Sequence, residues 1–420
     1  MLDIAGFRGL TYDPAKVDLS HVITPPYDVI NADQRAALAE RSPYNFVRID
    51  LPEQSAAHAD RYRSAADTLA GYQASGILRQ DTARSLYRYH QEFTDRERQC
   101  RVVRKGVLAA VALSPWSAGV IRPHEHTFKA AREDRMRMLE ATRVHLSPVF
   151  ATYEDDARDV ERLLEAATAD ASGPPDLVGT TDDGTRHSVW RISDPATIAE
   201  VSRLLAAKHA YVLDGHHRYE TMVAFREREA GSPVTERGLM FLVPMNDPGL
   251  IILPTHRLIH GVAGLSRDGF LAAAAPHCRI ERVAGAARDA AQLRAAMTAA
   301  SPGPVFAAAF PGDPDAHLLI FPDDAGALEP EVAVLHRVVL ERMLGVTGGA
   351  EGQPKIRYVS DTAATLDEIA AGRAQLALLV RPPPLAQIKQ LSDLGRVMPQ
   401  KSTYFFPKLA SGLVMMPLDP

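Results

Sequence analysis

Cysteine is scarce in this chain, with Cys100 and Cys278 as the two among 420 residues. They lie in unrelated contexts, which excludes a disulfide framework and a zinc cluster built on cysteines. No apolar run reaches the length of a membrane span, and the first residues lack the basic and apolar regions of a signal peptide. We therefore expect a cytoplasmic protein that has no membrane partner.

The sequence also lacks an excess of positive charge and any internal repeat. A net charge of −5 argues against a broad nucleic-acid surface, although it leaves room for a local basic pocket. The absence of a repeat of 20 to 50 residues argues against solenoids and propellers. Hydrophobic residues make up 46% of the chain, which is ordinary for a globular protein, and the length allows two or three domains.

Strands and helices are predicted in mixed order. Residues 85–93 and 101–113 read as two strands of a hairpin, residues 46–51 as a further strand, and residues 304–310 as one of several short strands after 266. The Gly/Pro loop at 171–175 marks a module boundary. We predict an α+β fold with mixed sheets. The predicted domains are 1–170, 171–265 and 266–420.

The densest cluster of ionisable residues is the segment 210–220, Ala-Tyr-Val-Leu-Asp-Gly-His-His-Arg-Tyr-Glu. Residues 210–213 predict a buried strand, which Asp214 and Gly215 end. Apolar residues at helical spacing from about His217 predict a helix. This strand–turn–helix brings an acid, two imidazoles and a guanidinium together within five residues.

Such a turn suits an anion. Backbone N–H groups at a helix N-terminus attract phosphate, Gly215 and His217 lie at that terminus, and Arg218 offers a planar fork of donors. Asp214 and either His216 or His217 suit proton transfer, and a histidine together with Asp214 could hold a divalent cation. The alternative is that Asp214 caps the helix while the histidines pack or face water. We favour a phosphate site, because a structural turn needs no such density of charge.

A second motif is the segment 121–128, Ile-Arg-Pro-His-Glu-His-Thr-Phe. On a strand, His124 and His126 would share a face, which permits metal binding or joint contact with a ligand. Glu125 is the better candidate for a general base, because a carboxylate in a pocket can have its pKa moved toward the working pH. Arginines of the next helix, including Arg143, could hold an anionic substrate, or they could form a solvated charged face.

Two weaker signals lie near the ends of the chain. Paired prolines at 25–26 fix Tyr27 and Asp28, either as a stiff loop or as a wall of the ligand pocket. Lys401 precedes a serine and a threonine, a combination that suits a phosphate, although the glycine framework of a Walker A loop is absent.

In these motifs the chain resembles a bacterial and archaeal family of uncharacterised proteins known as DUF1015. The matching stretches lie, in chain order, at residues 24–30, 122–127, 133–148, 214–220 and 398–404. They span nearly the whole chain. Because the family is poorly described, this resemblance implies little about mechanism.

The turn also looks like the phosphate loop of the ParB/sulfiredoxin superfamily, which includes CTP-binding ParB proteins, sulfiredoxins and ADP- or ATP-dependent free-serine kinases. In the serine kinases, a corresponding Asp-Gly-His-x-Arg turn binds nucleotide phosphates and acts with an acidic base. Asp214, His216 and Arg218 match that pattern, and His217 occupies the variable place. The resemblance implies a similar nucleotide-binding core. It does not imply sulfiredoxin activity, since the turn has no cysteine.

We therefore predict a Mg²⁺-assisted phosphotransferase that uses ATP, ADP or CTP and acts on a small hydroxyl metabolite, with free serine as the first candidate. Asp214 or Glu125 would take the hydroxyl proton or help bind the metal, with Asp28 in reserve. His216 and His124 would contact the transferring group, and Lys401 would close the pocket.

Two alternatives remain open. One is a non-catalytic nucleotide switch like the CTP-binding ParB proteins. The other is a metal-dependent hydrolase built on His124, His126 and Asp214. A small-molecule substrate is the expected partner, and a homo-oligomer is compatible with the sequence.

Overall fold

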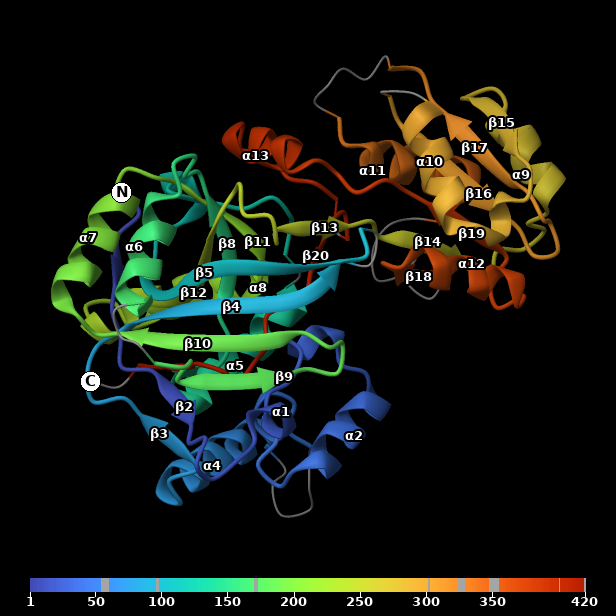
Figure 1. Cartoon of the computed structure of the whole chain (residues 1–420). Helices are drawn as coiled ribbons and strands as arrows, with labels where there is room; N and C mark the ends of the chain where they lie inside the picture. Colours follow the sequence, from blue (N-terminus) through green and yellow to red (C-terminus); the bar gives the residue numbers. More distant parts are fainter. Residues whose placement is uncertain are drawn as a thin grey trace. The chain divides into compact units, whose positions relative to one another are not determined.

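The chain forms two compact units in the computed structural model (Figure 1). Unit 1 contains Met1–Pro123, Thr127–Ile251 and Pro407–Pro420, and unit 2 contains His124–His126 and Ile252–Phe406. The described residues are 1–53, 60–95, 98–127, 129–169, 173–300, 303–323, 329–346, 355–399 and 401–418. Within those ranges, every helix is too short or too polar to span a bilayer.

Unit 1 is built on a large mixed sheet, which has nine strands within the described ranges. Its order is β6 (Ile121–Arg122), β11 (Ala210–Asp214), β8 (Val149–Tyr153), β12 (Arg237–Pro244), β5 (Cys100–Ala112), β4 (Leu86–Asp95), β10 (Arg186–Ile192) and β9 (Leu177–Thr180), with β1 (Ile4–Ala5) on β5. The predicted hairpin of β4 and β5 is confirmed. Because β10 pairs with β4, the two sides of the predicted boundary at 170/171 share one sheet.

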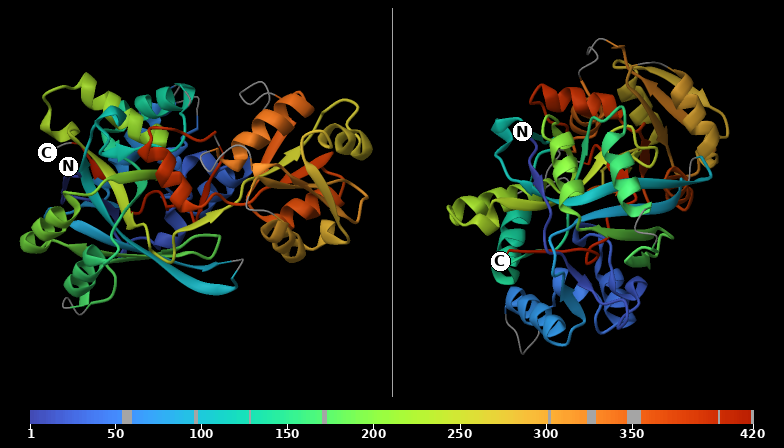
Figure 2. Two further views of the ribbon diagram at one scale, coloured as in Figure 1. Left: turned by 90° about the horizontal axis from the view of Figure 1, so that it is seen from above. Right: turned by 60° about the vertical axis from the view of Figure 1, so that its left-hand side comes forward.

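Helices and two small sheets complete unit 1. The helices are α1 (Leu19–Val22), α2 (Ala32–Arg41), α3 (Val47–Asp50), α4 (Arg61–Ala74), α5 (Lys129–Thr142), α6 (Asp159–Ala169), α7 (Pro195–Leu205) and α8 (His216–Arg228). The small sheets pair β2 (Leu10–Tyr12) with β3 (Leu78–Gln80), and β7 (Val144–His145) with β21 (Met416–Pro417). The views in Figures 1 and 2 show α6 beside α7, and both contribute to one apolar core with the sheet.

The predicted strand at 46–51 is wrong, because α3 occupies that segment. The side chain of Asn45 accepts a hydrogen bond from the Val47 backbone N–H at 3.0 Å. This local bond favours a helical turn over an extended strand. Apolar character alone cannot separate a buried strand from a buried helical turn.

Unit 2 contains a sheet of six strands within the described ranges. Its order is β15 (Arg279–Val283), β17 (Ala316–Ile320), β16 (Val305–Ala309), β19 (Leu376–Leu379), β14 (His256–Ile259) and β18 (Ile356–Val359). A short pair joins β13 (Ile251–Leu253) to β20 (Tyr404–Phe406). The short strand predicted at 304–310 is confirmed as β16.

Both faces of the six-stranded sheet are apolar, because alternate residues of each strand enter two different cores. One core includes α9 (Arg267–Ala274), α11 (Glu331–Val334) and the π-helix Leu335–Met343 that continues it. The other includes α10 (Ala290–Ala300) and α12 (Thr362–Ala370). The remaining α-helix of the described residues in this unit is α13 (Leu385–Asp393).

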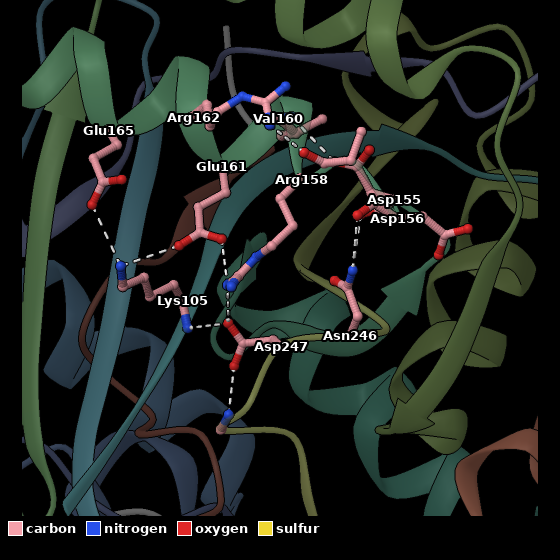
Figure 3. A network of polar contacts seen from close by, with 12 residues as sticks. Lys105, Asp155, Asp156, Arg158, Val160, Glu161, Arg162, Glu165, Asn246 and Asp247 are labelled. Carbon is pink, nitrogen blue, oxygen red and sulfur yellow. Dashed lines mark hydrogen bonds and ion pairs between the residues drawn. The ribbon is translucent and has the colours of Figure 1, made fainter.

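Alternation along β5 also places two neighbouring basic residues on opposite faces of the unit 1 sheet. Lys105 contacts Glu161 and Glu165 of α6, with Nζ–Oε1 distances of 3.1 and 3.4 Å (Figure 3). Arg104 is fully buried and donates from Nε to the Gly249 carbonyl at 3.0 Å. Its Nη1 donates to the Pro407 carbonyl at 2.8 Å, which ties the C-terminal segment to this sheet.

Asp247 is a buried carboxylate in the loop that follows β12. Its Oδ1 accepts from the Gly249 backbone N–H at 2.8 Å, and its Oδ2 lies 3.4 Å from Arg158 Nη2 (Figure 3). Burial raises the pKa of Asp247 to about 6. Hydrogen bonds from the backbone N–H groups of Gly249 and Lys105, and the charges of Arg104 and Arg158, oppose this shift. The acid therefore holds its proton to a higher pH in the folded protein than in the unfolded chain.

We predict that Gly249→Ala destabilises unit 1. A Cβ at this position would lie 2.5 Å from the Cα and the backbone N of Arg104, so the backbone must shift. The expected loss in free energy of unfolding is about 1–3 kcal/mol, measured by denaturant titration. Gly71→Ala in α4 is the control, since no atom lies within 4 Å of its Cβ and alanine favours a helix by about 0.5–1 kcal/mol. Equal stability of the Gly249→Ala variant and the wild type would contradict the packing described.

A second prediction concerns pH. Between about pH 4, near the unfolded pKa of an aspartate, and about pH 6, the folded protein binds the Asp247 proton and the unfolded chain does not. Asp247 therefore lowers the free energy of unfolding as the pH rises through this window, by an amount on the order of 1–3 kcal/mol. In Asp247→Asn, unfolding measured at pH 4 and pH 6 should lack this loss. An identical pH dependence in variant and wild type would show that the carboxyl titrates normally.

Candidate functional site

The strand–turn–helix expected at 210–220 is present in unit 1. β11 ends at Asp214, and α8 begins at His216. Gly215 adopts the left-handed conformation, with φ 89° and ψ 28°, which glycine tolerates far better than other residues. No side-chain hydrogen bond caps α8 at Gly215, so the first turn presents its backbone N–H groups without a side-chain acceptor from that position.

Asp214 sits between two cations. Its Oδ2 lies 2.8 Å from Arg218 Nη2, and its Oδ1 lies 2.6 Å from Lys408 Nζ. Burial alone would raise the pKa of this carboxyl, but the charges of Lys408 and Arg218 outweigh burial and hold the pKa well below its usual range. Asp214 is therefore an ionised structural anion at neutral pH and a weak base.

Arg218 is buried and bonded within the protein. Its Nη1 donates to the Ser147 hydroxyl at 3.1 Å and to the Pro148 carbonyl at 2.5 Å, while Nη2 binds Asp214. The guanidinium fork thus fixes the turn against the segment before β8. Direct contact between Arg218 and a phosphate remains a prediction. Such a contact would require the guanidinium N–H groups to bond the phosphate as well as Ser147, Pro148 or Asp214.

The two histidines of the turn differ in exposure, since His216 is buried and His217 is half-buried. Later in α8, the Glu220 carboxylate accepts from the Thr127 hydroxyl at 2.6 Å and from Trp116 Nε1 at 2.9 Å. Thr127 ends the His-Glu-His-Thr motif, so its side chain and the Asp-Gly-His-His-Arg motif meet in unit 1.

Tyr27 also belongs to this neighbourhood. The Arg135 guanidinium carbon lies 3.8 Å from the centre of the Tyr27 ring, and Arg135 Nη1 binds Asp50 Oδ1 at 2.9 Å. Burial raises the pKa of Tyr27 to about 12, and the charges of Arg135 and Arg218 act against it. Tyr27, which the sequence predicts as a wall of the ligand pocket, is therefore affected by the charge of Arg218. The side chain of Asp28 is exposed.

A small cavity of about 40 Å³ adjoins Arg218 in unit 1. It is lined by Asp50, Arg135, Met138, Leu139, Val144, His145, Leu146, Ser147, Arg218, Thr221 and Met222. Among the described atoms, Asp50 Oδ2 and His145 Nε2 are buried without a hydrogen-bond partner. Burial lowers the pKa of His145 to about 4, so the imidazole is neutral, and a bond with the Arg237 backbone opposes that shift.

The structure does not bring Arg143 to the turn. Arg143 forms an ion pair with Glu229 and its guanidinium carbon lies 5.3 Å from the centre of the Phe225 ring. Both partners lie at the C-terminal end of α8, which has 13 residues and a length of roughly 20 Å. The predicted role of Arg143 at the same site as the turn therefore lacks structural support.

The remaining predicted residues gather in unit 2. His124 is buried with Nε2 3.0 Å from Thr403 Oγ1, and Glu125 Oε1 accepts from the Lys401 backbone N–H at 3.3 Å. Glu125 also forms a β-bridge with Met398. The two motifs that contain His124 and Lys401 thus form one cluster, through hydrogen bonds between residues 276 and 279 positions apart in sequence. The side chains of His126 and Lys401 are exposed.

A buried arginine, Arg257, supports this cluster. Its Nη2 donates to the Lys401 carbonyl at 3.2 Å, and its guanidinium carbon lies 5.5 Å from the centre of the Tyr358 ring. Burial lowers the pKa of Arg257 to about 10, and Tyr358 opposes the shift. Burial raises the pKa of Tyr358, and the negative charge of Glu125 adds to the shift, while Arg257 opposes it.

The described residues do not form a metal site from protein side chains alone. Within those residues, no group of three or more His, Cys, Asp or Glu side chains is arranged to hold a metal ion. Both oxygens of the candidate ligand Asp214 bind cationic side chains. The candidate ligands Asp214 and His126, and the hydrolase built on them with His124, therefore gain no support from the geometry.

Sequence reasoning missed Lys408, Asp50 and the role of Arg257. Lys408 lies 194 residues from Asp214, and Asp50 lies 85 residues from Arg135. No local pattern marks such pairs, because each depends on how distant segments pack. The one available signal is composition, since an acid such as Asp50 in an apolar segment is rarely buried unless it is paired.

We predict that ordered water fills the cavity beside Arg218. Water can donate to Asp50 Oδ2 and form a hydrogen bond with His145 Nε2, and a cavity needs only about 10–15 Å³ to hold one molecule. A crystal structure at about 1.5 Å resolution should show one or two waters within hydrogen-bond distance of both atoms. A dry cavity with both atoms still unbonded would contradict the expectation.

Comparisons with known proteins place this chain in a family but assign no activity. A free serine kinase variant in complex with AMP is 12% identical, with a TM-score of 0.38 over 71% of this chain and 86% of that one. SbnI with a C-terminal truncation from Staphylococcus aureus is also 12% identical, with a TM-score of 0.38 over 74% of this chain and 87% of that one. A conserved hypothetical protein from Pyrococcus furiosus is 13% identical, with a TM-score of 0.36 over 73% and 95%.

With TM-scores below 0.5, these likenesses carry no argument about function. No curated protein matches the chain. The family described as "Protein of unknown function (DUF1015)" matches residues 4–330. The chain therefore belongs to the DUF1015 family.

Proposed function

We propose that the protein is a nucleotide-dependent phosphotransferase that acts on a small hydroxyl compound, with free serine as the first candidate. The observation that carries the proposal is the turn at Gly215. It joins a left-handed glycine, a helix N-terminus without a side-chain cap, and a carboxylate held between two cations. In this view the strand–turn–helix is a ParB/sulfiredoxin-like nucleotide-binding core.

The charge around the turn supports an anionic ligand. Arg218 and Lys408 bring two positive charges and Asp214 brings one negative charge, so the three side chains sum to +1. The helix dipole adds about half a positive charge at the start of α8. Together these features favour nucleotide phosphates at Gly215, His216 and His217, which would supply backbone N–H groups.

Of the two predicted proton acceptors, Asp214 is the weaker candidate. Asp214 has both oxygens bound to cations and a lowered pKa, which makes it a weak base. Glu125 is half-buried, and the Lys401 backbone N–H binds one of its oxygens. In the proposed step, the acceptor O–H bond breaks and the base, for which the sequence offers Glu125, takes the proton. The acceptor oxygen bonds to the terminal phosphorus, and the bond from that phosphorus to the leaving nucleotide oxygen breaks.

A divalent cation fits the proposal only as a partner of the nucleotide. Mg²⁺ is commonly bound by one or two carboxylates together with substrate phosphates. Since Asp214 already holds two cationic side chains, the phosphates themselves would supply most of the Mg²⁺ ligands. The cation would then neutralise phosphate charge, while Arg218 keeps the turn in place.

We predict that nucleoside di- or triphosphates with Mg²⁺ raise the melting temperature of the wild type. A ligand at 100 times its Kd adds about 2.7 kcal/mol to the stability of the native state. Glu125→Gln should retain this stabilisation and lose product formation from serine, measured by phosphorus NMR, by roughly 100-fold or more.

Arg203→Ala, which removes an exposed ion pair on α7, is the control and should leave both readouts unchanged. Stabilisation by a nucleotide without turnover of any hydroxyl compound would favour the switch over the enzyme. If no nucleotide shifts the melting temperature, the proposed function fails.

A further inference from the structure

Lys408 lies at the turn although the sequence gives no reason to expect it there. Its Nζ is 2.6 Å from Asp214 Oδ1, and Arg218 already neutralises the same carboxylate from the other side at 2.8 Å. One cation is enough to balance one carboxylate. Two cationic side chains therefore flank a single carboxylate at this turn.

Two fully buried side chains fix the main chain on which Lys408 stands. Arg104 Nη1 donates to the Pro407 carbonyl at 2.8 Å, and Gln91 Nε2 donates to the Lys408 carbonyl at 2.9 Å. Arg104 Nη1 also donates to Gln91 Oε1 at 2.9 Å, which links the two anchors. Burying a guanidinium and an amide costs free energy that hydrogen bonds must offset. Here these donors hold one short C-terminal stretch in a defined position.

The Lys408 side chain is partly exposed. The side chain of Lys408 is 15% exposed and that of Asp214 is 17% exposed, so neither is sealed in the core. A lysine ammonium is a compact point charge with three rotatable donors, which suits a phosphate. The neighbouring N-terminus of α8 presents backbone N–H groups to the same kind of anion.

We propose that Lys408 is a phosphate-binding residue of the Asp214 turn, positioned by Arg104 and Gln91. Its ammonium group binds a polyphosphate anion that is seated at the start of α8. The inference deepens the proposed function, since the nucleotide is the ligand that function requires. Its chemistry, however, is that of any polyphosphate and can be tested separately.

The experiment compares wild type, Lys408→Met and Lys208→Met by calorimetric titration with ATP and Mg²⁺, and with inorganic tripolyphosphate. Lys208 is a matched control, because its Nζ lies 3.2 Å from Asp155 Oδ1 in the same unit and its side chain is 24% exposed. Loss of a charge-assisted hydrogen bond should weaken binding by about 10- to 100-fold in Lys408→Met and leave Lys208→Met close to wild type. Unchanged affinity in Lys408→Met overturns the inference.

A purely structural Lys408 would lower the melting temperature without changing affinity, so unfolding of each variant is recorded in parallel. If Lys408→Met does not fold, the double variant Lys408→Met/Asp214→Asn removes both charges of the pair and takes its place. Asp214→Asn alone is its reference, since that variant keeps Lys408 and Arg218.

The two ligands separate the two claims. Binding of tripolyphosphate that depends on Lys408, with no binding of any nucleotide, supports the anion site and contradicts the proposed function. Nucleotide binding that is independent of Lys408 contradicts the inference and leaves the proposed function standing. No binding of either ligand overturns both.

Discussion

The ion-pair triad of Lys408, Asp214 and Arg218 is the interaction on which the turn depends. It joins the end of β11, the first turn of α8 and the C-terminal segment through one carboxylate. Arg218 extends the triad to Ser147 and Pro148. Because these bonds are partly buried, removing one partner would leave an uncompensated charge, which is far more costly than losing a surface ion pair.

Two buried arginines elsewhere in the chain hold main-chain segments in place. In unit 1, the buried Arg104 donates hydrogen bonds to the carbonyls of Gly249 and Pro407. In unit 2, the buried Arg257 donates to the carbonyl of Lys401. Each arginine therefore fixes a stretch of main chain within its own unit. Each buried guanidinium stabilises one conformation of the main chain to which it donates.

The sequence predicted the parts of the molecule that local patterns determine. The hairpin of β4 and β5, and the turn at Gly215, follow from strand alternation, glycine and helical spacing. The segment at 46–51 could not be predicted correctly, because Asn45 starts a helical turn inside an apolar run. Lys408 and Asp50 escaped notice for a different reason. Their partners lie 194 and 85 residues away, and only tertiary packing creates such pairs.

The central claim is that the start of α8 is a seat for phosphate oxygens. Amide resonances of Gly215, His216 and His217, recorded by ¹⁵N–¹H NMR during titration with ATP and Mg²⁺, test it most directly. Amides that donate to phosphate should shift downfield and saturate together with a single Kd. If nucleotide binds while these three amides stay unchanged and resonances elsewhere move, the turn is structural and the account is contradicted.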